Sequence, residues 1–400
     1  MITAHYRSVE SELPGAAIGL PDGGSHTAGQ ASSATQHSSA TQPRNGTQHS
    51  GPRDLVLESD RPVEIDSLEL HPGQCVRGAP GRRPLVVVPS TGLAIDVEDV
   101  RFENIDFVYD HPGGQQASVL RLHCGRAEFR GCSFRATGSA STLPAAIRWL
   151  HPTEAGDSAL SLPSGRLQLS DCLLRSVAAG IDCRTVGALA VEMDNTLHLG
   201  SGPLVRLDHC PKADEPVLIA LSGVTLRASG PVLECCCRHV EDQPGVIRIR
   251  ASRCAFAPGP DKALLLFVGP QSSESSFESS LESSSASLLG AVQWTGQGSL
   301  VAPPTVVAAW QGADGRQHVL DDASVSIAGL VRSEVGFAGE AHSGPEGNRV
   351  IRWLAPLPTA DPPGADPASL SWGQTSLAKD AVDEGRRAKD DSRRTNNEWQ

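Results

Sequence analysis

The sequence has few aromatic residues and no basic excess, and both shortages narrow its possible functions. Aromatic residues make up 4% of the 400 residues and apolar residues 39%, so a core would consist mainly of aliphatic and cysteine side chains. The net charge of -12 provides no broad basic surface for nucleic acid or anionic lipid. We therefore expect no nucleic-acid partner.

Long apolar runs are also missing. No stretch of about eighteen apolar residues occurs, and the first residues lack the apolar segment of a signal peptide. We expect no membrane insertion by this chain, which reads as soluble as given. Its compartment stays open, and an extracytoplasmic location is compatible with a start codon placed inside a longer gene.

The cysteines lack the spacings of common metal sites. There are ten, without paired CxxC motifs or a CxxC near an HxxxH. Most fall at apolar positions of the repeat described below, where a thiol behaves as a small buried hydrophobe. We therefore expect reduced core cysteines, no metal and no cofactor. In the run of three, Cys235 and Cys237 should face the core and Cys236 should be a candidate reactive thiol outside.

Low-complexity segments divide the chain into three parts. Residues 1–54 form a leader rich in Gly, Ser, Thr and Gln, which we expect to be disordered. Residues 356–400 form a Pro-rich and then charged tail with the same expectation. Within the patterned region of residues 55–355, two stretches should be surface excursions, near residues 151–164 and 271–288.

A short pattern recurs in the patterned region: two alternating apolar residues, a turn-forming residue, then two more alternating apolar residues. In one copy, Val100 and Phe102 precede Asn104, and Ile105 and Phe107 follow it. Because a strand alternates its faces with period two, all four apolar side chains face one side only if the chain bends at Asn104. The same shift recurs at further pivots: Gly131, Asp171, Asn195, Gly223, Arg253 and Gly329.

The pivots suit sharp corners between strands. Five of the first six are Asn, Gly or Asp, which adopt positive φ more readily than other residues, and Arg253 is the exception. The first six are separated by 27, 40, 24, 28 and 30 residues, which suits one turn of a three-faced coil. A further strand signal between pivots, such as Ile181 with Cys183, supplies the third face. We predict an all-β fold, a right-handed parallel β-helix over residues 55–355.

Two other architectures fit less well. A β-sandwich would need tight Asn-Gly or Asp-Gly hairpin turns every 8 to 12 residues or so, and such turns are scarce. A doubly wound α/β domain would need long amphipathic helices, for which the intervals are too short and too rich in β-branched residues.

Residues 102–107, 129–134 and 169–174 resemble the repeat units of pectate-lyase-like right-handed β-helix proteins, over about residues 60–335. That superfamily includes lyases, hydrolases, epimerases, adhesins and non-catalytic modules, so the resemblance implies architecture and no single activity. Residues 98–110, 183–187 and 326–337 are similar to the β-helical C-terminal region of bacterial serine/threonine-kinase-related proteins. This implies the non-kinase part, because the sequence has no kinase Gly-rich loop, His-Arg-Asp loop or Asp-Phe-Gly motif.

Acidic residues gather in one predicted coil, from Asp96 to Asp110. A β-helix lyase acts through a calcium-binding cluster of carboxylates with arginine or lysine as base, and a related hydrolase pairs aspartates. The candidate catalytic residues are Asp99, Arg101 and Asp106. The simpler interpretation is a charged outer face, because the outward positions of a solvated coil are polar anyway.

Histidines and tryptophans supply weaker candidates. Without a partner at diagnostic spacing, four histidines are interpreted as surface or turn residues: His123, His151, His198 and His209. Four tryptophans could stack on sugar rings if exposed, but at strand positions they more often fill a core: Trp149, Trp294, Trp310 and Trp353.

The sequence thus predicts a non-catalytic β-helical binding or scaffold module that presents an elongated surface to a protein or polysaccharide. The alternative is a polysaccharide lyase or hydrolase that uses the acidic outer face near Asp96 to Asp110. A third hypothesis is the remnant of a larger kinase-like protein. Oligomeric state is left open.

Overall fold

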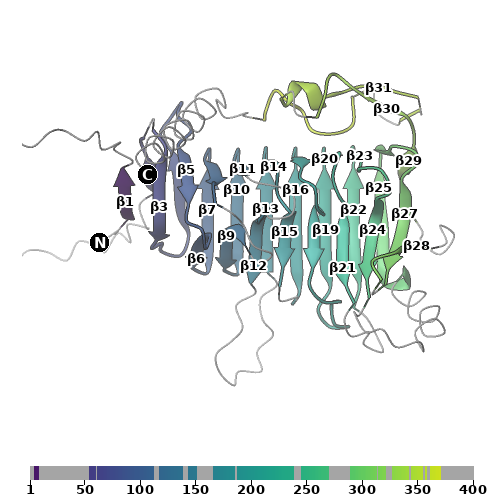
Figure 1. The fold of residues 1–400 in the computed structure, drawn as a ribbon, viewed down its shortest axis with the longest axis horizontal. Helices are drawn as coiled ribbons and strands as arrows, with labels where there is room; N and C mark the ends of the chain where they lie inside the picture. The colour runs from purple at the N-terminus through teal and green to yellow at the C-terminus, as the bar shows by residue number, and fades with distance from the viewer. Residues whose placement is uncertain are drawn as a thin grey trace, which may run out of the picture.

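Three parallel sheets run the length of a column of stacked coils in the computed structural model (Figure 1). The structure describes the backbone of residues 4–8, and residues 54–59, 61–111, 117–137, 143–150, 165–184, 187–237, 245–269, 289–312, 314–320, 327–341, 344–354, 356–357 and 361–370. The predicted excursions at residues 151–164 and 271–288 lie outside this part of the chain, as does His151. No helix among the described residues has the length and apolarity to cross a membrane.

From β4 to β27 each coil contributes one strand to each sheet, while β1 and β28 add antiparallel strands at the ends of sheets A and C. Sheet A contains β1 (Ala4–Ser8), β3 (Val63–Leu68), β5 (Leu85–Val88), β8 (Asp106–Tyr109), β11 (Ser133–Ala136), β14 (Leu173–Arg175), β17 (Leu197–Leu199), β20 (Thr225–Arg227), β23 (Ala255–Ala257), β26 (Ser299–Val301) and β29 (Leu330–Arg332). Sheet B contains β2 (Leu55–Leu57), β4 (Gln74–Gly78), β7 (Asp99–Glu103), β10 (Arg126–Arg130), β13 (Gly165–Ser170), β16 (Leu189–Asp194), β19 (Val217–Ser222), β22 (Ile247–Ser252) and β25 (Val292–Gln297). Sheet C contains β6 (Leu93–Asp96), β9 (Ser118–His123), β12 (Ala145–Leu150), β15 (Ala179–Cys183), β18 (Val205–Leu207), β21 (Leu233–Cys236), β24 (Ala263–Val268), β27 (Val306–Gln311) and β28 (Gln317–Val319).

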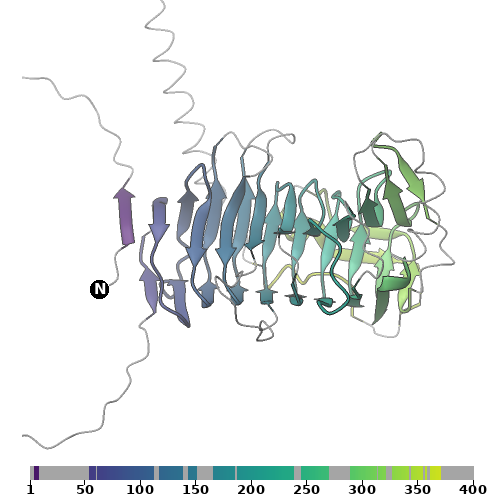
Figure 2. The ribbon, with the colours of Figure 1, turned by 90° about the horizontal axis from the view of Figure 1, so that it is seen from below.

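The pairing confirms the predicted parallel β-helix. The chain passes from sheet B to sheet A to sheet C, then enters the next coil, as in the order β7, β8, β9, β10. Equivalent strands of neighbouring coils pair in parallel, as in Val191 with Ile219 and Ile219 with Ile249. Figure 2, turned by 90°, shows the coils following one another along one axis.

The predicted pivots lie at the corners between sheets B and A. All seven have positive φ, including Arg253 at 51°. Their amide groups connect neighbouring coils, since the Asn195 N–H donates to the carbonyl oxygen of Ser222 at 2.9 Å and the Gly223 N–H to that of Ser252 at 3.0 Å. Gly298, with φ 66°, occupies the corner between β25 and β26, which the repeat did not reveal.

Inward side chains form one apolar column. Phe102 stacks on Phe129 with ring centroids 5.2 Å apart, and Phe107 stacks on Phe134 at 5.3 Å. This matches the spacing of neighbouring strands in a sheet, about 4.8 Å, and shows side chains of one type layered in register. Eight of the ten cysteines are buried, as predicted for core positions. Trp149, with Trp294 and Trp310, also lies in this core.

Three parts of the chain differ from the predicted division into leader, β-helix and tail. β1 pairs antiparallel with β3 at the N-terminal end of sheet A, within the segment predicted to be a disordered leader. β30 (Val335–Phe337) and β31 (Val350–Trp353) form an antiparallel pair, with the 3-10 helix η3 (Glu346–Asn348) between them, outside the coils (Figure 1). Residues 361–370, here called the strap, lie within the predicted tail and yet pack on the corners.

The strap is held by hydrogen bonds to three successive coils. The Gly364 N–H donates to the Arg253 carbonyl oxygen at 2.6 Å, and the Ala365 N–H donates to Thr225 Oγ1 at 2.8 Å. The Asp366 N–H then donates to Asn195 Oδ1 at 2.6 Å. Ala365 and Leu370 share a small apolar cluster with Leu173, Leu197 and Leu199 on the outside of sheet A. Residues 361–370 therefore run back along the column, which the local composition did not predict.

Candidate functional site

The three candidate catalytic residues do not form a common site. Asp99 and Arg101 lie on β7 of sheet B, whereas Asp106 lies beyond the Asn104 corner, on β8 of sheet A. The Asp106 carboxylate is buried, and its Oδ1 lies 2.6 Å from Nη2 of Arg83. The same oxygen accepts a hydrogen bond from the Ser133 hydroxyl at 2.6 Å. Asp106 is thus occupied in joining neighbouring coils.

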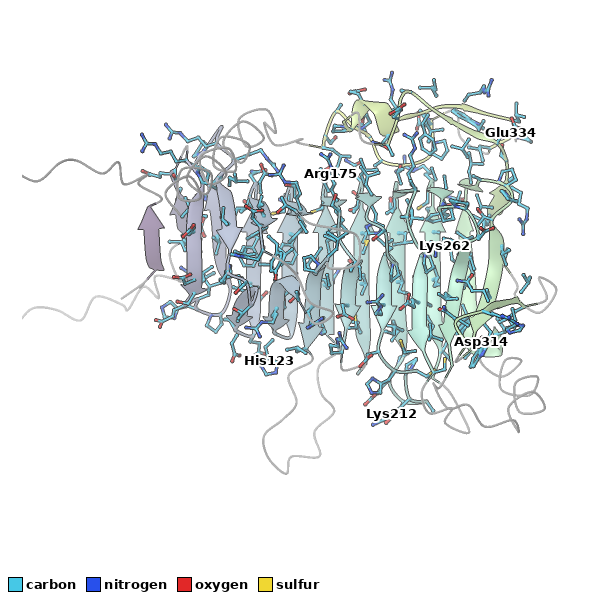
Figure 3. The ribbon with its side chains drawn as sticks, in the orientation of Figure 1. His123, Arg175, Lys212, Lys262, Asp314 and Glu334 are labelled. Atoms are coloured by element: carbon cyan, nitrogen blue, oxygen red, sulfur yellow. The ribbon has the colours of Figure 1, made fainter. Side chains whose placement is uncertain are left out.

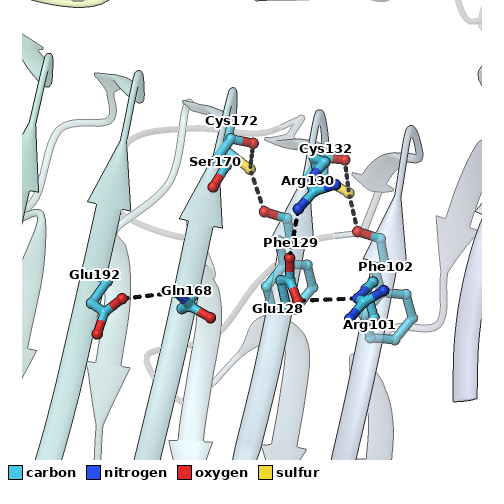
Figure 4. A network of polar contacts seen from close by, with 10 residues as sticks. All are labelled: Arg101, Phe102, Glu128, Phe129, Arg130, Cys132, Gln168, Ser170, Cys172 and Glu192. Carbon is cyan, nitrogen blue, oxygen red and sulfur yellow. Dashed lines mark hydrogen bonds and ion pairs between the residues drawn. The ribbon is translucent and has the colours of Figure 1, made fainter. Parts of the chain in front are cut away.

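Arg101 is likewise occupied by a neighbouring strand. Its Nε donates to Glu128 Oε2 at 3.0 Å, and the other Glu128 oxygen accepts from Nη2 of Arg130 at 3.1 Å (Figure 4). The nearby carboxylate raises the pKa of Arg101 further above its ordinary value. The remaining acidic residues of this coil are distributed over its faces, with Asp96 on sheet C beside His123, Nδ1 to Oδ1 3.7 Å.

The histidines were predicted to be surface or turn residues, and one of those described, His198, is buried instead. His123 and His209 have partly exposed side chains, with exposed fractions of 42% and 55%, as predicted. His198 is fully buried on β17, and the prediction of a surface or turn residue was wrong there. Its Nε2 lies 3.1 Å from the Gly202 carbonyl oxygen, and burial lowers its pKa to about 4. The repeat could have predicted this burial, because His198 occupies a position after the Asn195 corner that is apolar in the other coils.

A hollow lies on the outer face of sheet B, where the row of long side chains is interrupted. β19 presents the short side chains of Ala220 and Ser222 between Glu192 on β16 and Arg250 on β22. The resulting cavity has a volume of about 370 Å³. We call this the sheet B hollow; its outward-facing lining residues are Gln168, Ser170, Glu192, Asp194, Ala220, Ser222, Arg250 and Ser252.

Charges of both signs line the sheet B hollow. Glu192 Oε2 accepts from Nε2 of Gln168 at 2.8 Å (Figure 4). The same oxygen accepts from Nη2 of Arg166 at 2.9 Å, so one wall of the hollow is fixed. Hydrogen bonding to Glu192 raises the pKa of Arg166. On the opposite wall, Arg250 is exposed and makes no side-chain hydrogen bond or ion pair with other described residues. Arg250 can therefore bind an incoming anionic group without breaking an existing pair.

A second cavity lies next to the sheet B hollow, at the corners between sheets B and A. It has a volume of about 530 Å³ and lies between the corner residues and the strap. Asp194 borders both cavities. Arg253 and Arg349 supply positive charge to the second cavity, and Asp361 and Asp366 supply negative charge. We call it the strap pocket, and we refer to the two neighbouring cavities together as the channel.

Three thiols come together among the described residues, although the cysteine spacing predicts no metal site. Sγ of Cys210 lies 3.7 Å from Sγ of Cys235 and 3.1 Å from Sγ of Cys237. These contacts lower the pKa of Cys210 and raise that of Cys235. Cys210 is separated from the other two by about one coil in sequence, so no short motif marks the cluster. Only their nearby positions in successive coils could have predicted that the thiols are neighbours.

Sheet pairing and corner geometry define the molecule as a parallel β-helix protein. Comparison with known proteins adds no relative, since no family model, curated protein or solved structure matches the chain.

Proposed function

We propose that this chain is a non-catalytic binding module that holds an extended polypeptide segment in the channel formed by the sheet B hollow and the strap pocket. The observation that carries this proposal is that Asp194 lines both cavities, so that a single extended segment could occupy the two in succession. A polypeptide offers backbone amide and carbonyl groups along its whole length. The hydroxyl and charged side chains of the channel can pair with these groups.

The distribution of aromatic residues favours a polypeptide over a polysaccharide. Sugar rings are commonly bound by stacking on exposed aromatic faces. None of the residues that line either cavity is aromatic. The large aromatic side chains of the coils lie in the core, including Trp149, Trp294 and Trp310. A polysaccharide ligand is therefore the less favoured outcome of the test below.

The alternative of a polysaccharide lyase or hydrolase has weaker support. It requires carboxylates and a base that converge on one substrate. Asp106 is held by Arg83 and Ser133 on a different sheet from Asp99 and Arg101. The finer resemblances, to pectate-lyase-like proteins and to the non-kinase part of kinase-related proteins, stay predictions. An in-frame kinase domain in the upstream DNA would support the second of them.

A pair of matched substitutions tests the proposed channel. Ala220→Tyr should fill the sheet B hollow, because Ala220 points outward from the middle of β19. Ala190→Tyr is the control, since Ala190 also points outward from sheet B but does not line either cavity. Neither substitution alters the core.

Peptides would be selected from a displayed library of extended sequences against the unsubstituted protein. Selected peptides should bind the Ala190→Tyr variant normally and lose at least about tenfold in affinity, some 1.4 kcal/mol, for Ala220→Tyr. Equal binding to both variants would exclude the hollow as the site. A parallel panel of uronate and neutral polysaccharides, with and without calcium, tests the alternatives. Turnover that Asp106→Ala abolishes would overturn the binding-module proposal.

A further inference from the structure

Three cysteine sulfurs converge at one edge of the column. Cys235 lies on β21 and Cys237 follows that strand, and because they are two residues apart both face the interior, where both are buried. Cys210 lies in the preceding coil, after β18, and is partly exposed. All three sulfurs lie within 4.8 Å of one another. Figure 3 labels Lys212, two residues beyond Cys210, at this edge.

The spacing of the sulfurs is close to that of a metal thiolate centre. With metal to sulfur bonds of about 2.3 Å, three ligands around one ion lie roughly 3.8 to 4.0 Å apart. Two of the distances here are 3.1 and 3.7 Å. Side-chain rotations that move the sulfurs by less than about 1 Å would therefore accommodate an ion. Thiolate sulfur is a soft ligand that selects Zn²⁺ and Cu⁺ among the common cellular metals.

The backbone around the thiols is fixed from several directions. The Cys237 N–H donates to the Val268 carbonyl oxygen at 2.7 Å, which joins it to the next coil. Before Cys210, the Asp208 N–H donates to the Cys183 carbonyl oxygen at 2.9 Å. After it, the Pro211 carbonyl oxygen accepts from the Gly245 N–H at 2.7 Å. A site whose ligands are already positioned loses little conformational entropy when the ion binds.

Other stacked cysteines in the protein do not offer such a site. Cys132 and Cys172 also lie in neighbouring coils, and their sulfurs contact the carbonyl oxygens of Phe102 at 3.5 Å and Phe129 at 3.6 Å, but among the described residues no third ligand joins them in a cluster. Both thiols are buried without a solvent-exposed partner. Cys210 differs because its partial exposure gives an ion a path from solvent to the two buried thiols.

We propose that Cys210, Cys235 and Cys237 bind one thiophilic metal ion, Zn²⁺ or Cu⁺, through their three sulfurs. Cu⁺ is satisfied by three sulfur ligands. Zn²⁺ would add a water or an external ligand on the side of Cys210 that faces solvent. The metal site is independent of the proposed function, because the sulfurs lie on the sheet C side of the coils, whereas the channel lies on sheet B and at the corners between sheets B and A.

Metal titration of the reduced, metal-free full chain tests the site. Zn²⁺, Co²⁺ as its spectroscopic substitute, and Cu⁺ would each be added in competition with a chelator of known affinity. We expect one equivalent of ion per chain, and a sulfur-to-cobalt charge-transfer band in the near ultraviolet. Comparison of the Zn²⁺ and Cu⁺ affinities identifies the preferred ion.

Two serine substitutions make the titration specific. Cys210→Ser removes the partly exposed ligand and should weaken binding at least about tenfold. The control, Cys236→Ser, changes the outward-facing member of the same run and should bind as the unsubstituted protein does. Far-ultraviolet circular dichroism establishes that each variant is folded. In the folded unsubstituted protein, the bound ion should raise the melting temperature, and Cys210→Ser should reduce that increase.

Two results would overturn the proposal. One is binding that is unchanged in Cys210→Ser, which would place the ion elsewhere. The other is a Cys210–Cys237 disulfide, found by mass spectrometry in protein purified without reductant and resistant to mild reduction, together with no tight binding after full reduction. That result would make the cluster a structural cross-link instead of a metal site.

Discussion

The side-chain amide of Asn195 donates a hydrogen bond to the carboxylate of Asp171, with Nδ2 2.6 Å from Oδ1, and joins the corners of two successive coils. Both residues have positive φ, 45° for Asn195 and 53° for Asp171. The remaining side-chain oxygen of Asn195 accepts from the Asp366 N–H of the strap. One side chain therefore links a corner, its neighbour and the returning C-terminal segment.

Asn195→Asp should destabilise the protein although the two side chains have nearly the same shape. The substitution removes the amide donor and sets two carboxylates against each other at neutral pH, at an expected cost of about 1 to 3 kcal/mol in the free energy of unfolding. Denaturant unfolding measures the change. The double variant Asp171→Asn with Asn195→Asp restores an amide and a carboxylate, and should recover most of the loss. Failure to recover would show that the pair does not contribute through this hydrogen bond.

Two corner glycines should respond differently to alanine. Gly223 and Gly329 both have positive φ, 60° and 81°. A Cβ at Gly223 would have the Gly364 carbonyl oxygen as its nearest neighbour at 3.5 Å, an ordinary contact. A Cβ at Gly329 would collide with the backbone carbonyl of Gly296. We expect Gly223→Ala to cost about 1 to 2 kcal/mol, the usual penalty for a left-handed residue, and Gly329→Ala to cost more. Equal melting temperatures for the two variants would contradict the corner geometry.

Stability should decrease as pH falls from 6.5 towards 4, because His198 is buried uncharged. Its pKa is lowered by burial from 6.5 to about 4, so the unfolded chain binds a proton in this range before the folded protein does. The predicted loss at pH 5 is on the order of 2 kcal/mol, from 1.36 kcal/mol per pKa unit. Melting temperatures at pH 7 and pH 5 measure it. His198→Leu should reduce the difference, and an unchanged difference would assign the pH dependence to other groups.

Asp106→Ala should reduce stability. The Arg83 side chain is only 19% exposed, and the substitution leaves its guanidinium without an ion-pair partner. It also removes the carboxylate that accepts the hydrogen bond of the Ser133 hydroxyl. We expect a loss of about 1.5 to 3 kcal/mol, typical for hydrogen bonds to charged groups. Asp99→Ala is the control, because Asp99 makes no side-chain hydrogen bond with other described residues and should change stability by less than about 0.5 kcal/mol. Equal effects on thermal unfolding would refute the structural role of Asp106.

The corners could be predicted from sequence because they depend on local rules. A one-residue shift in an alternating pattern has few structural solutions, and Asn, Gly or Asp at the shift identifies the left-handed corner. Arg253 obeys the shift although its residue type opposes it, which shows that the apolar pattern outweighed backbone preference at that position. Gly298 was missed because its coil is interrupted by the serine-rich stretch, which hides the spacing.

The channel and the thiol cluster depend on contacts between coils, which local patterns do not encode. The sheet B hollow exists because short Ala220 lies between two longer side chains contributed by neighbouring strands. The strap is bound through Thr225 and Asn195, far away in sequence from residues 361–370. The three thiols become neighbours only when the coil that contains Cys210 is placed beside β21. To predict any of these contacts, the exact register between neighbouring coils would have to be known.

All of these features require strands stacked in parallel and in register, which distances between spin labels on sheet B can measure directly. Arg126, Arg166, Ala190, Leu218, Arg248 and Gln293 occupy one row on successive strands. Pairs of labels would be placed along this row. They would be attached to a genetically encoded non-natural amino acid, because labelling through cysteine would also modify the native cysteines. At about 4.8 Å per strand, backbone separations should be roughly 14 Å for Arg126 to Leu218 and roughly 24 Å for Arg126 to Gln293. A separation that does not increase by this step with each added strand would contradict the parallel β-helix.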